Sequence, residues 1–285
     1  MDTPFDRRLR RLRRDRAART GFVDYLHRHA ADDLLDRLDS VTRSFTRVLD
    51  LGCAGGFLGE TLRGRGLEVT SADAGLLFAR RADGIMCDED RLPFTDGAFD
   101  LVVSVGVLDS VNDLPGALTL IRRVLRPDGL FLGAFAGAGS LPRLRAAMLA
   151  ADALGEGASP RIHPQIDVRA AGDLLARAGF ALPVADSSRV DVRFPHLFAL
   201  AADLRRMAGT NILASRARRP ILRSGLAAAA ADFAAAAEPD GKTVEHFDII
   251  HVAGWAPSPD QPKPARRGSA TASLADTLPP RGGIR

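Results

Sequence analysis

Cysteine is scarce in this sequence of 285 residues, which contains only Cys53 and Cys87. Two cysteines cannot build the disulfide framework that stabilises small secreted domains, and they fit a reducing compartment. No apolar run approaches the roughly 18 residues that a membrane-spanning helix needs. The arginine-rich start is not followed by the apolar core of a secretory signal. We therefore expect a cytoplasmic protein without a membrane span.

Lysine is almost absent, because it occurs only at Lys242 and Lys263 and the other cationic side chains are arginines. Arginines gather near the start, in FDRRLRRLRRDRAART at residues 5–20. The acidic residues among them argue against an organelle-targeting peptide. This stretch predicts either a solvated helix or a helix that docks onto an acidic partner surface. A nucleic-acid ligand is unexpected, because the interleaved aromatic residues of a stacking surface are missing.

Hydrophobic residues make up 46% of the sequence, and their spacing alternates between the strand and helix periods. Strands are predicted at 47–52, 67–73, 84–87, 99–105, 130–136, 181–194 and 244–257. Helices are predicted at 6–38 (two, with a break near Gly21), 56–66, 74–82, 113–129, 141–154, 167–180 and about 196–237. This alternation predicts an α/β fold, with a parallel sheet and crossover helices on both faces.

The same pattern divides the chain into three parts. Residues 1–40 are predicted to form a helical arm, and residues 41–256 the main domain. A helical insertion at about 196–243 is expected either to cover the substrate as a lid or to pack as part of the core. Residues 257–285 lack a periodic apolar face and are predicted to be a flexible tail.

The stretch VLDLGCAGG at residues 48–56 joins a predicted strand to a predicted helix, where doubly wound sheets bind their ligands. A dinucleotide-binding turn would read G-x-G-x-x-G, but Ala54 and Phe57 replace its second and third glycines. Asp50 would also repel a pyrophosphate. A positively charged ligand without phosphate removes the conflict, and S-adenosylmethionine carries a sulfonium and an ammonium group. We therefore predict S-adenosylmethionine as the cofactor.

Acidic residues also follow the next two predicted strands. Asp73 stands where an acid binds ribose hydroxyls in such sheets, and Asp88 could accept a hydrogen bond from the adenine amino group. Each acid alone could instead cap a helix, but their occurrence at three successive strand ends favours a cofactor site. The predicted cofactor-binding residues are Asp50, Gly52, Cys53, Ala54, Gly56, Asp73, Ala74, Asp88, Glu89 and Ser104.

The stretches SADAG, DEDRLPFTDGAFDLVVS and RRVLRPDGLFL, together with the turn, resemble the class I S-adenosylmethionine-dependent methyltransferases. That resemblance implies a seven-stranded Rossmann-like sheet whose last strand is antiparallel. FDRRLRRLRRDRAA, SPRIHP and GWAPSPDQPKPARRGSATASL further resemble bacterial relatives of mitochondrial complex I assembly factor five. This closer resemblance implies an enzyme that modifies a protein, by methylation or by arginine hydroxylation, with an iron–sulfur subunit of complex I as its partner.

The sequence departs from that family beside the reacting group. Where the family typically reads Leu-His-Trp-Val-Asn-Asp, residues 108–113 read LDSVND, and Ala54 replaces a common glycine. For an arginine substrate we predict Asp109 as the catalytic-site residue that binds the guanidinium, with Asp113 as a second candidate. Two alternatives stay open: an O-methyltransferase for a small molecule or an acyl carrier protein, and a non-catalytic assembly factor that only binds the cofactor.

Two further expectations concern groups around the site. Tyr25 or an arginine of the helical arm is expected to reach the carboxylate of the cofactor. His246 and Asp248 lie two apart on a predicted strand, as two iron ligands could. They belong to the last strand, however, and the family does not carry that histidine, so no metal site is predicted.

Overall fold

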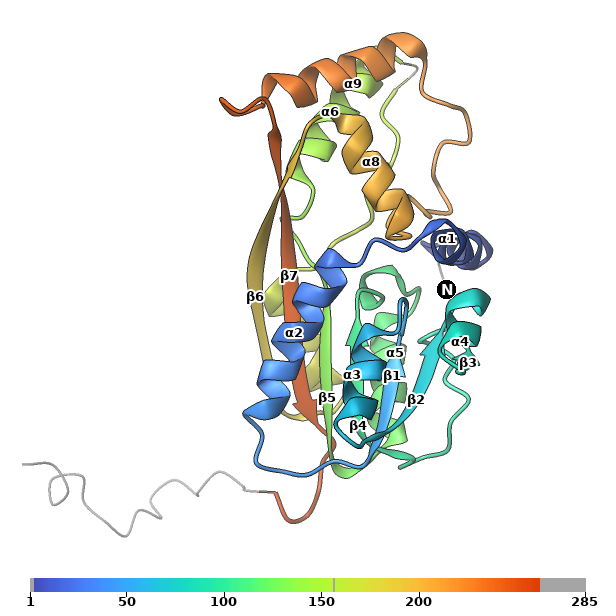
Figure 1. Cartoon of the computed structure of the whole chain (residues 1–285), viewed down its shortest axis with the longest axis vertical. Coiled ribbons are helices and arrows are strands. Elements are labelled where there is room, and N and C mark those ends of the chain that lie inside the picture. Colours follow the sequence, from blue (N-terminus) through green and yellow to red (C-terminus); the bar gives the residue numbers. More distant parts are fainter. Residues whose placement is uncertain (1–2, 156, 262–285) are drawn as a thin grey trace, which may run out of the picture.

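The computed structural model describes residues 3–155 and 157–261, and these form a seven-stranded sheet with helices on both faces (Figure 1). The strands run in the order β3-β2-β1-β4-β5-β7-β6. Neighbouring strands are parallel from β3 to β5, whereas β7 is antiparallel to both of its neighbours. The predicted α/β sheet with an antiparallel last strand is therefore confirmed. The strands are β1 (Arg47–Leu51), β2 (Glu68–Asp73), β3 (Ile85–Met86), β4 (Phe99–Val105), β5 (Leu125–Ala136), β6 (Ala181–Phe194) and β7 (Thr243–Trp255).

Helices cover the sheet because successive residues of its central strands are apolar and point to opposite faces. In β4, Val103 packs in the core layer under α2 and α3, and Val102 packs in the layer under α5 and α7. The helices are α1 (Arg7–Thr20), α2 (Tyr25–Asp39), α3 (Phe57–Gly64), α4 (Leu76–Arg81), α5 (Leu114–Val124), α6 (Pro142–Ala153), α7 (Val168–Arg177), α8 (Leu197–Arg206) and α9 (Arg223–Ala235), with a 3₁₀ turn η1 (Leu108–Ser110).

Two of the predicted helices are wrong in extent: one ends earlier than predicted and one is interrupted. The helix predicted for 113–129 ends at Val124, and β5 begins at Leu125, which pairs with Phe99 of β4. Pro127 contributes to this early end, because the residue before a proline is disfavoured in helical conformation. Sheet pairing and the proline together therefore place the helix end before the glycine turn.

The helix predicted for about 196–237 is interrupted between α8 and α9. In this connection Ile212 and Leu213 are buried against Phe5, and Leu213 forms a β-bridge with Phe5. Ile212 also accepts a hydrogen bond from the amide of Asp6 (2.8 Å). Contacts with the start of the chain therefore hold this segment in extended form.

Helices α6, α8 and α9 gather at the ends of the long strands β6 and β7 that lie uppermost in Figure 1. α9 packs against α6 and α8, and α8 also packs against α1. None of the helices in the described part of the chain is long and apolar enough to cross a membrane. Most of the predicted tail, from residue 262 onward, lies outside the described residues.

Candidate functional site

The glycine turn after β1 brings its backbone to the carboxyl edge of the sheet. Gly52 and Gly56 have φ angles of 86° and 87°, and a Cβ on Gly52 would lie 2.6 Å from methyl carbons of Val107. Ala54 also has a positive φ, 42°, which is uncommon for a residue with a side chain. Its amide donates a hydrogen bond to Oδ2 of Asp73 (3.0 Å). The turn is therefore fixed by its glycines and by the acid at the end of β2.

Asp73, the predicted ribose-binding acid, is fully buried and already accepts four hydrogen bonds. Besides the Ala54 amide, the Gly75 amide donates to Oδ1 (2.7 Å). Arg14 of α1 donates from Nε to Oδ1 (2.7 Å) and from Nη2 to Oδ2 (2.5 Å). Burial lowers the pKa of Arg14, but the charge of Asp73 more than offsets this and raises it above its ordinary value. Asp73 lies where the sequence predicted it, and a guanidinium holds its oxygens.

The predicted adenine-site acids contact the same helix. Glu89 is buried and forms a bidentate pair with Arg10, at 2.6 and 2.8 Å. Asp88 accepts a hydrogen bond from Arg11 at 2.5 Å and another from Arg7 at 3.2 Å. We call these side chains the acid-facing arginines: Arg7, Arg10, Arg11 and Arg14. Their helical spacing places them on one side of α1, which lies beside α4 in Figure 1.

Two other predicted cofactor residues have buried oxygens without partners. Oδ2 of Asp50 and Oγ of Ser104 form no hydrogen bond. Burial, and then repulsion from Asp73, raises the pKa of Asp50 to about 7. Asp50, Gly52 and Cys53 line a small cavity of about 30 Å³. Buried polar atoms are rarely left unsatisfied, so these oxygens are candidates for contact with a ligand.

The other predicted residues at this edge of the sheet have roles in the local structure. Gly56 is the N-cap of α3, and Ala74 is buried directly after Asp73. Asp113 caps α5, because its Oδ1 accepts a hydrogen bond from the Gly116 amide (2.8 Å). This cap accounts for Asp113 without a substrate role.

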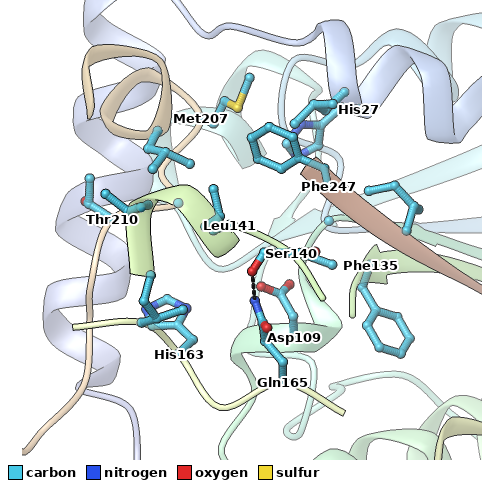
Figure 2. A pocket seen from close by; sticks show the side chains of 18 of the residues that line it. His27, Asp109, Phe135, Ser140, Leu141, His163, Gln165, Met207, Thr210 and Phe247 are labelled. Carbon is cyan, nitrogen blue, oxygen red and sulfur yellow. Dashed lines mark hydrogen bonds between the residues drawn. The ribbon is translucent and has the colours of Figure 1, made fainter. Parts of the chain in front are cut away.

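A larger cavity of about 270 Å³ lies beside the ends of β4 and β5 (Figure 2). Most of its wall is apolar and comes from α2, α8, β7 and the segment that leads into α6: Leu26, Ala30, Leu141, Leu144, Leu204, Met207, Phe247 and Ile249. The polar groups that reach it are few: His27, Asp109, Ser140, Arg161, His163, Gln165, Thr210 and Asn211. A largely apolar cavity with a few polar groups is typical of a small-molecule or side-chain binding site.

Asp109, the predicted substrate-binding residue, lines this cavity from η1 (Figure 2). Burial raises the pKa of its carboxyl group, although the charge of Arg10 opposes the rise. Gln165 donates from Nε2 to the carbonyl oxygen of Ser140 (3.2 Å), which fixes another polar part of the wall. A half-buried carboxyl group in a largely apolar wall is suited to binding a cationic side chain, because the cation would favour its charged form.

His27 lines both cavities, and sequence reasoning missed it. Burial, and then the charge of Arg14, lowers its pKa to about 4, and its Nδ1 has no partner. Gly106 makes room for the ring, since a Cβ there would lie 2.5 Å from Nε2 of His27. The available signal was its place beside Leu26 and Ala30, on the apolar side of α2.

His163 was also missed as a wall residue. Burial lowers its pKa to about 4, and its Nε2 accepts a hydrogen bond from the Ile212 amide (3.0 Å). No sequence spacing connects this loop residue with the strand ends, so the tertiary structure alone places it in the cavity.

Tyr25, His246 and Asp248, which the sequence analysis also considered, each contact another residue of the chain. Tyr25 donates to Oδ2 of Asp203 on α8 (3.3 Å), so its hydroxyl is directed toward α8. His246 and Asp248 each contact a residue of β6, namely Asp191 (2.6 Å) and Arg189 (2.8 Å). Within residues 3–155 and 157–261, no group of three His, Cys, Asp or Glu side chains is arranged to hold a metal ion.

Comparisons with known sequences cover nearly the whole chain. The family model described as a methyltransferase domain matches residues 49–133. Arginine-hydroxylase NDUFAF5, mitochondrial, from Danio rerio is 36% identical, over 95% of this chain and 88% of that protein. The Homo sapiens protein of the same name is also 36% identical, over 95% of this chain and 82% of its own length. The malonyl-[acyl-carrier protein] O-methyltransferase of Laribacter hongkongensis is 30% identical, over 86% of this chain and 87% of its own.

Among solved structures, the YcgJ protein of Bacillus subtilis aligns with a TM-score of 0.55. The alignment covers 81% of this chain and all of that one, at 16% identity. At this identity the likeness shows a common fold.

Proposed function

Because this chain belongs to the family of the arginine hydroxylase NDUFAF5, we propose that it is an S-adenosylmethionine-binding enzyme that modifies an arginine side chain of a protein. The observation that carries this proposal is Asp109, a half-buried carboxyl group in the wall of a largely apolar cavity. Carboxylates bind guanidinium groups in a bidentate manner. We further propose, from the resemblance described above, that its protein substrate is an iron–sulfur subunit of respiratory complex I. Both cysteines of this chain, Cys53 and Cys87, are free, which fits a reaction in the cytoplasm.

The residues at the sheet edge fit S-adenosylmethionine, on one condition. Asp73 offers acceptors for ribose hydroxyls, and Asp88 offers one for the adenine amino group. Oδ2 of Asp50, which has no partner, suits the ammonium group. Since Arg14 holds both oxygens of Asp73, the ribose can bind only after this guanidinium has moved away. When bound, the cofactor supplies an electrophilic methyl group on its sulfonium.

The chain's own residues then bind and orient the substrate. Asp109 would pair with the guanidinium, while apolar side chains such as Phe247 and Met207 would surround its methylene groups and exclude water. His27 is neutral well above pH 4 and has a ring nitrogen without a partner. Its ring is therefore placed to form a hydrogen bond with a substrate group in the cavity.

Calorimetric titration with S-adenosylmethionine tests the cofactor part of this proposal. We expect the wild-type protein to bind and the Asp73→Ala protein to lose binding, because the ribose acceptors are gone. Asp109→Asn should bind the cofactor like wild type. A folded wild-type protein without measurable binding would overturn the proposal.

Mass spectrometry of complex I subunits incubated with the enzyme, S-adenosylmethionine, dioxygen and a reductant tests the substrate part, because a methyl group would come from the cofactor and an oxygen atom from dioxygen. We expect a gain of one methylene or one oxygen on an arginine, and its loss with Asp109→Asn but not with the helix-cap variant Asp113→Asn. Transfer of a labelled methyl group to malonyl-acyl carrier protein would instead establish the function named for the bacterial relatives. Normal assembly with Asp109→Asn, and failed assembly with a variant that cannot bind cofactor, would show a non-catalytic assembly role.

A further inference from the structure

Arg13 is half-buried on α1 but does not belong to the acid-facing arginines. Its Nη1 donates to Oγ1 of Thr210, whereas its Nε is buried and has no partner. Burial, and then the nearby charges of Arg16 and Arg216, lowers its pKa to about 10. Such crowding of positive charge is unfavourable unless an anion joins it.

Arg13 faces an open groove with three more arginines: Arg161, Arg216 and Arg218. Two of these charges are matched, because Arg161 pairs with Asp152 (2.5 Å) and Arg216 with Asp6 (3.4 Å). Among the ion pairs of the described residues, neither Arg13 nor Arg218 takes part. We call these four residues the groove arginines. Asp6 also lines the groove and its charge acts on Arg13 and Arg218 as well, so four guanidinium groups share two carboxylates, Asp6 and Asp152, and two positive charges remain in excess.

The groove arginines lie at an edge of the large cavity. Arg161 and Asn211 line both the groove and the cavity. A polypeptide with one side chain in the cavity would therefore place its neighbouring residues in the groove. No aromatic residue lines the groove, so it lacks the stacking surface that single-stranded nucleic acids need.

We propose that the groove arginines bind the carboxylates of an acidic segment of the substrate protein, next to the arginine that enters the cavity. Arginine suits this role, since its planar group forms two parallel hydrogen bonds to a carboxylate. The proposal rests on the proposed function and adds a sequence preference: acidic residues close to the modified arginine. It also assigns the half-buried Arg13 a carboxylate in direct contact, whereas within the described residues Asp6 acts on it only from a distance.

Fluorescence anisotropy at low salt tests this preference. The probe is a fluorescein-labelled decapeptide with a central arginine flanked by glutamates, and its matched control has glutamines instead. We expect Arg13→Gln/Arg218→Gln to weaken binding of the glutamate peptide at least tenfold. The control variant Arg8→Gln/Arg19→Gln removes the same charge from exposed positions of α1 and should weaken it less than twofold.

Equal losses in the two variants would overturn the proposal, because net charge alone would then explain binding. Equal affinity for the glutamate and glutamine peptides would overturn it as well. Tighter binding of a labelled single-stranded DNA, sensitive to the groove variant, would replace the acidic protein with a nucleic acid. Calorimetry with S-adenosylmethionine on the same proteins keeps the two proposals separate: absent cofactor binding would refute the proposed function whatever the peptides show.

Discussion

The acid-facing arginines and Arg13 belong to the same helix, yet they have opposite surroundings. Arg10 and Arg14 are buried in bidentate pairs with Glu89 and Asp73, whereas Arg13, beside them in sequence, meets other arginines. The arginines of α1 therefore lie on two sides of the helix that have different surroundings. One side stabilises the docked helix over the cofactor edge, and the other leaves positive charge for a ligand.

The largest effect should follow from removing one partner of a buried pair. Glu89→Ala leaves Arg10 charged and buried, and should lower the free energy of unfolding by about 3–5 kcal/mol. The double variant Arg10→Met/Glu89→Leu should recover most of this loss, because no unpaired charge remains. Urea denaturation measures both. A single variant as stable as wild type would show that the pair does not hold α1 in place.

Asp50 lies at the same edge of the sheet as Asp73 and Glu89, but no arginine of α1 forms an ion pair with it. It therefore sharpens the comparison. Its pKa is raised from 3.8 to about 7, so between these values the folded state keeps a proton that the unfolded chain has lost. The free energy of unfolding of wild type, relative to Asp50→Asn, should therefore fall by about 2–3 kcal/mol from pH 5 to pH 8. Contributions of buried histidines cancel in this difference.

Denaturation curves at several pH values measure this effect, with Asp32→Asn as an exposed control that should change in parallel with wild type. A difference between wild type and Asp50→Asn that does not vary with pH would contradict the raised pKa.

Arg14 links the comparison to the cofactor. Arg14→Met removes the guanidinium from both oxygens of Asp73, which then keep one backbone amide each, and should tighten S-adenosylmethionine binding about tenfold, equivalent to about 1.4 kcal/mol. Calorimetry measures the affinity. Arg13→Met, on the other side of the helix, should leave it unchanged. Weaker binding by Arg14→Met would mean that this guanidinium assists the cofactor and does not compete with it.

The smallest effect is expected for Arg13 itself. Arg13→Gln removes a charge without a carboxylate partner and should change the free energy of unfolding by about 0.5 kcal/mol or less. Thermal denaturation beside Arg10→Gln makes the contrast visible. A loss as large as that of Arg10→Gln would contradict the difference between the two sides of α1.

The sheet and the cofactor edge could be predicted because their signals are local. The strands alternate with helices, Gly52 makes a turn that only glycine fits, and Asp50 and Asp73 follow strand ends. Asp109 could be chosen as a candidate because it lies in the turn that follows β4, and it lines the cavity. These signals need no knowledge of distant contacts.

The partners of α1 and the shape of the cavity could not be predicted. Arg14 and Asp73 are 59 residues apart, and nothing in their spacing distinguishes Arg14 from Arg13 as the residue that pairs. His27 reaches the cavity wall because α2 packs beside β4 and β5. Met207 reaches it because α8 packs against α1, α9 and β6. Such placements follow from packing between elements.

The docking of α1 also has a consequence for the order in which the protein assembles during its synthesis. Helix α1 leaves the ribosome before the acids that it pairs with, because Glu89 is made 79 residues after Arg10. Until then the arginines have no partner within the chain, and the helix can dock only once β2 and the segment after β3 exist. Closing so long a loop costs entropy that local helix formation does not. Helix α1 is therefore expected to dock only after elements that are synthesised later than itself.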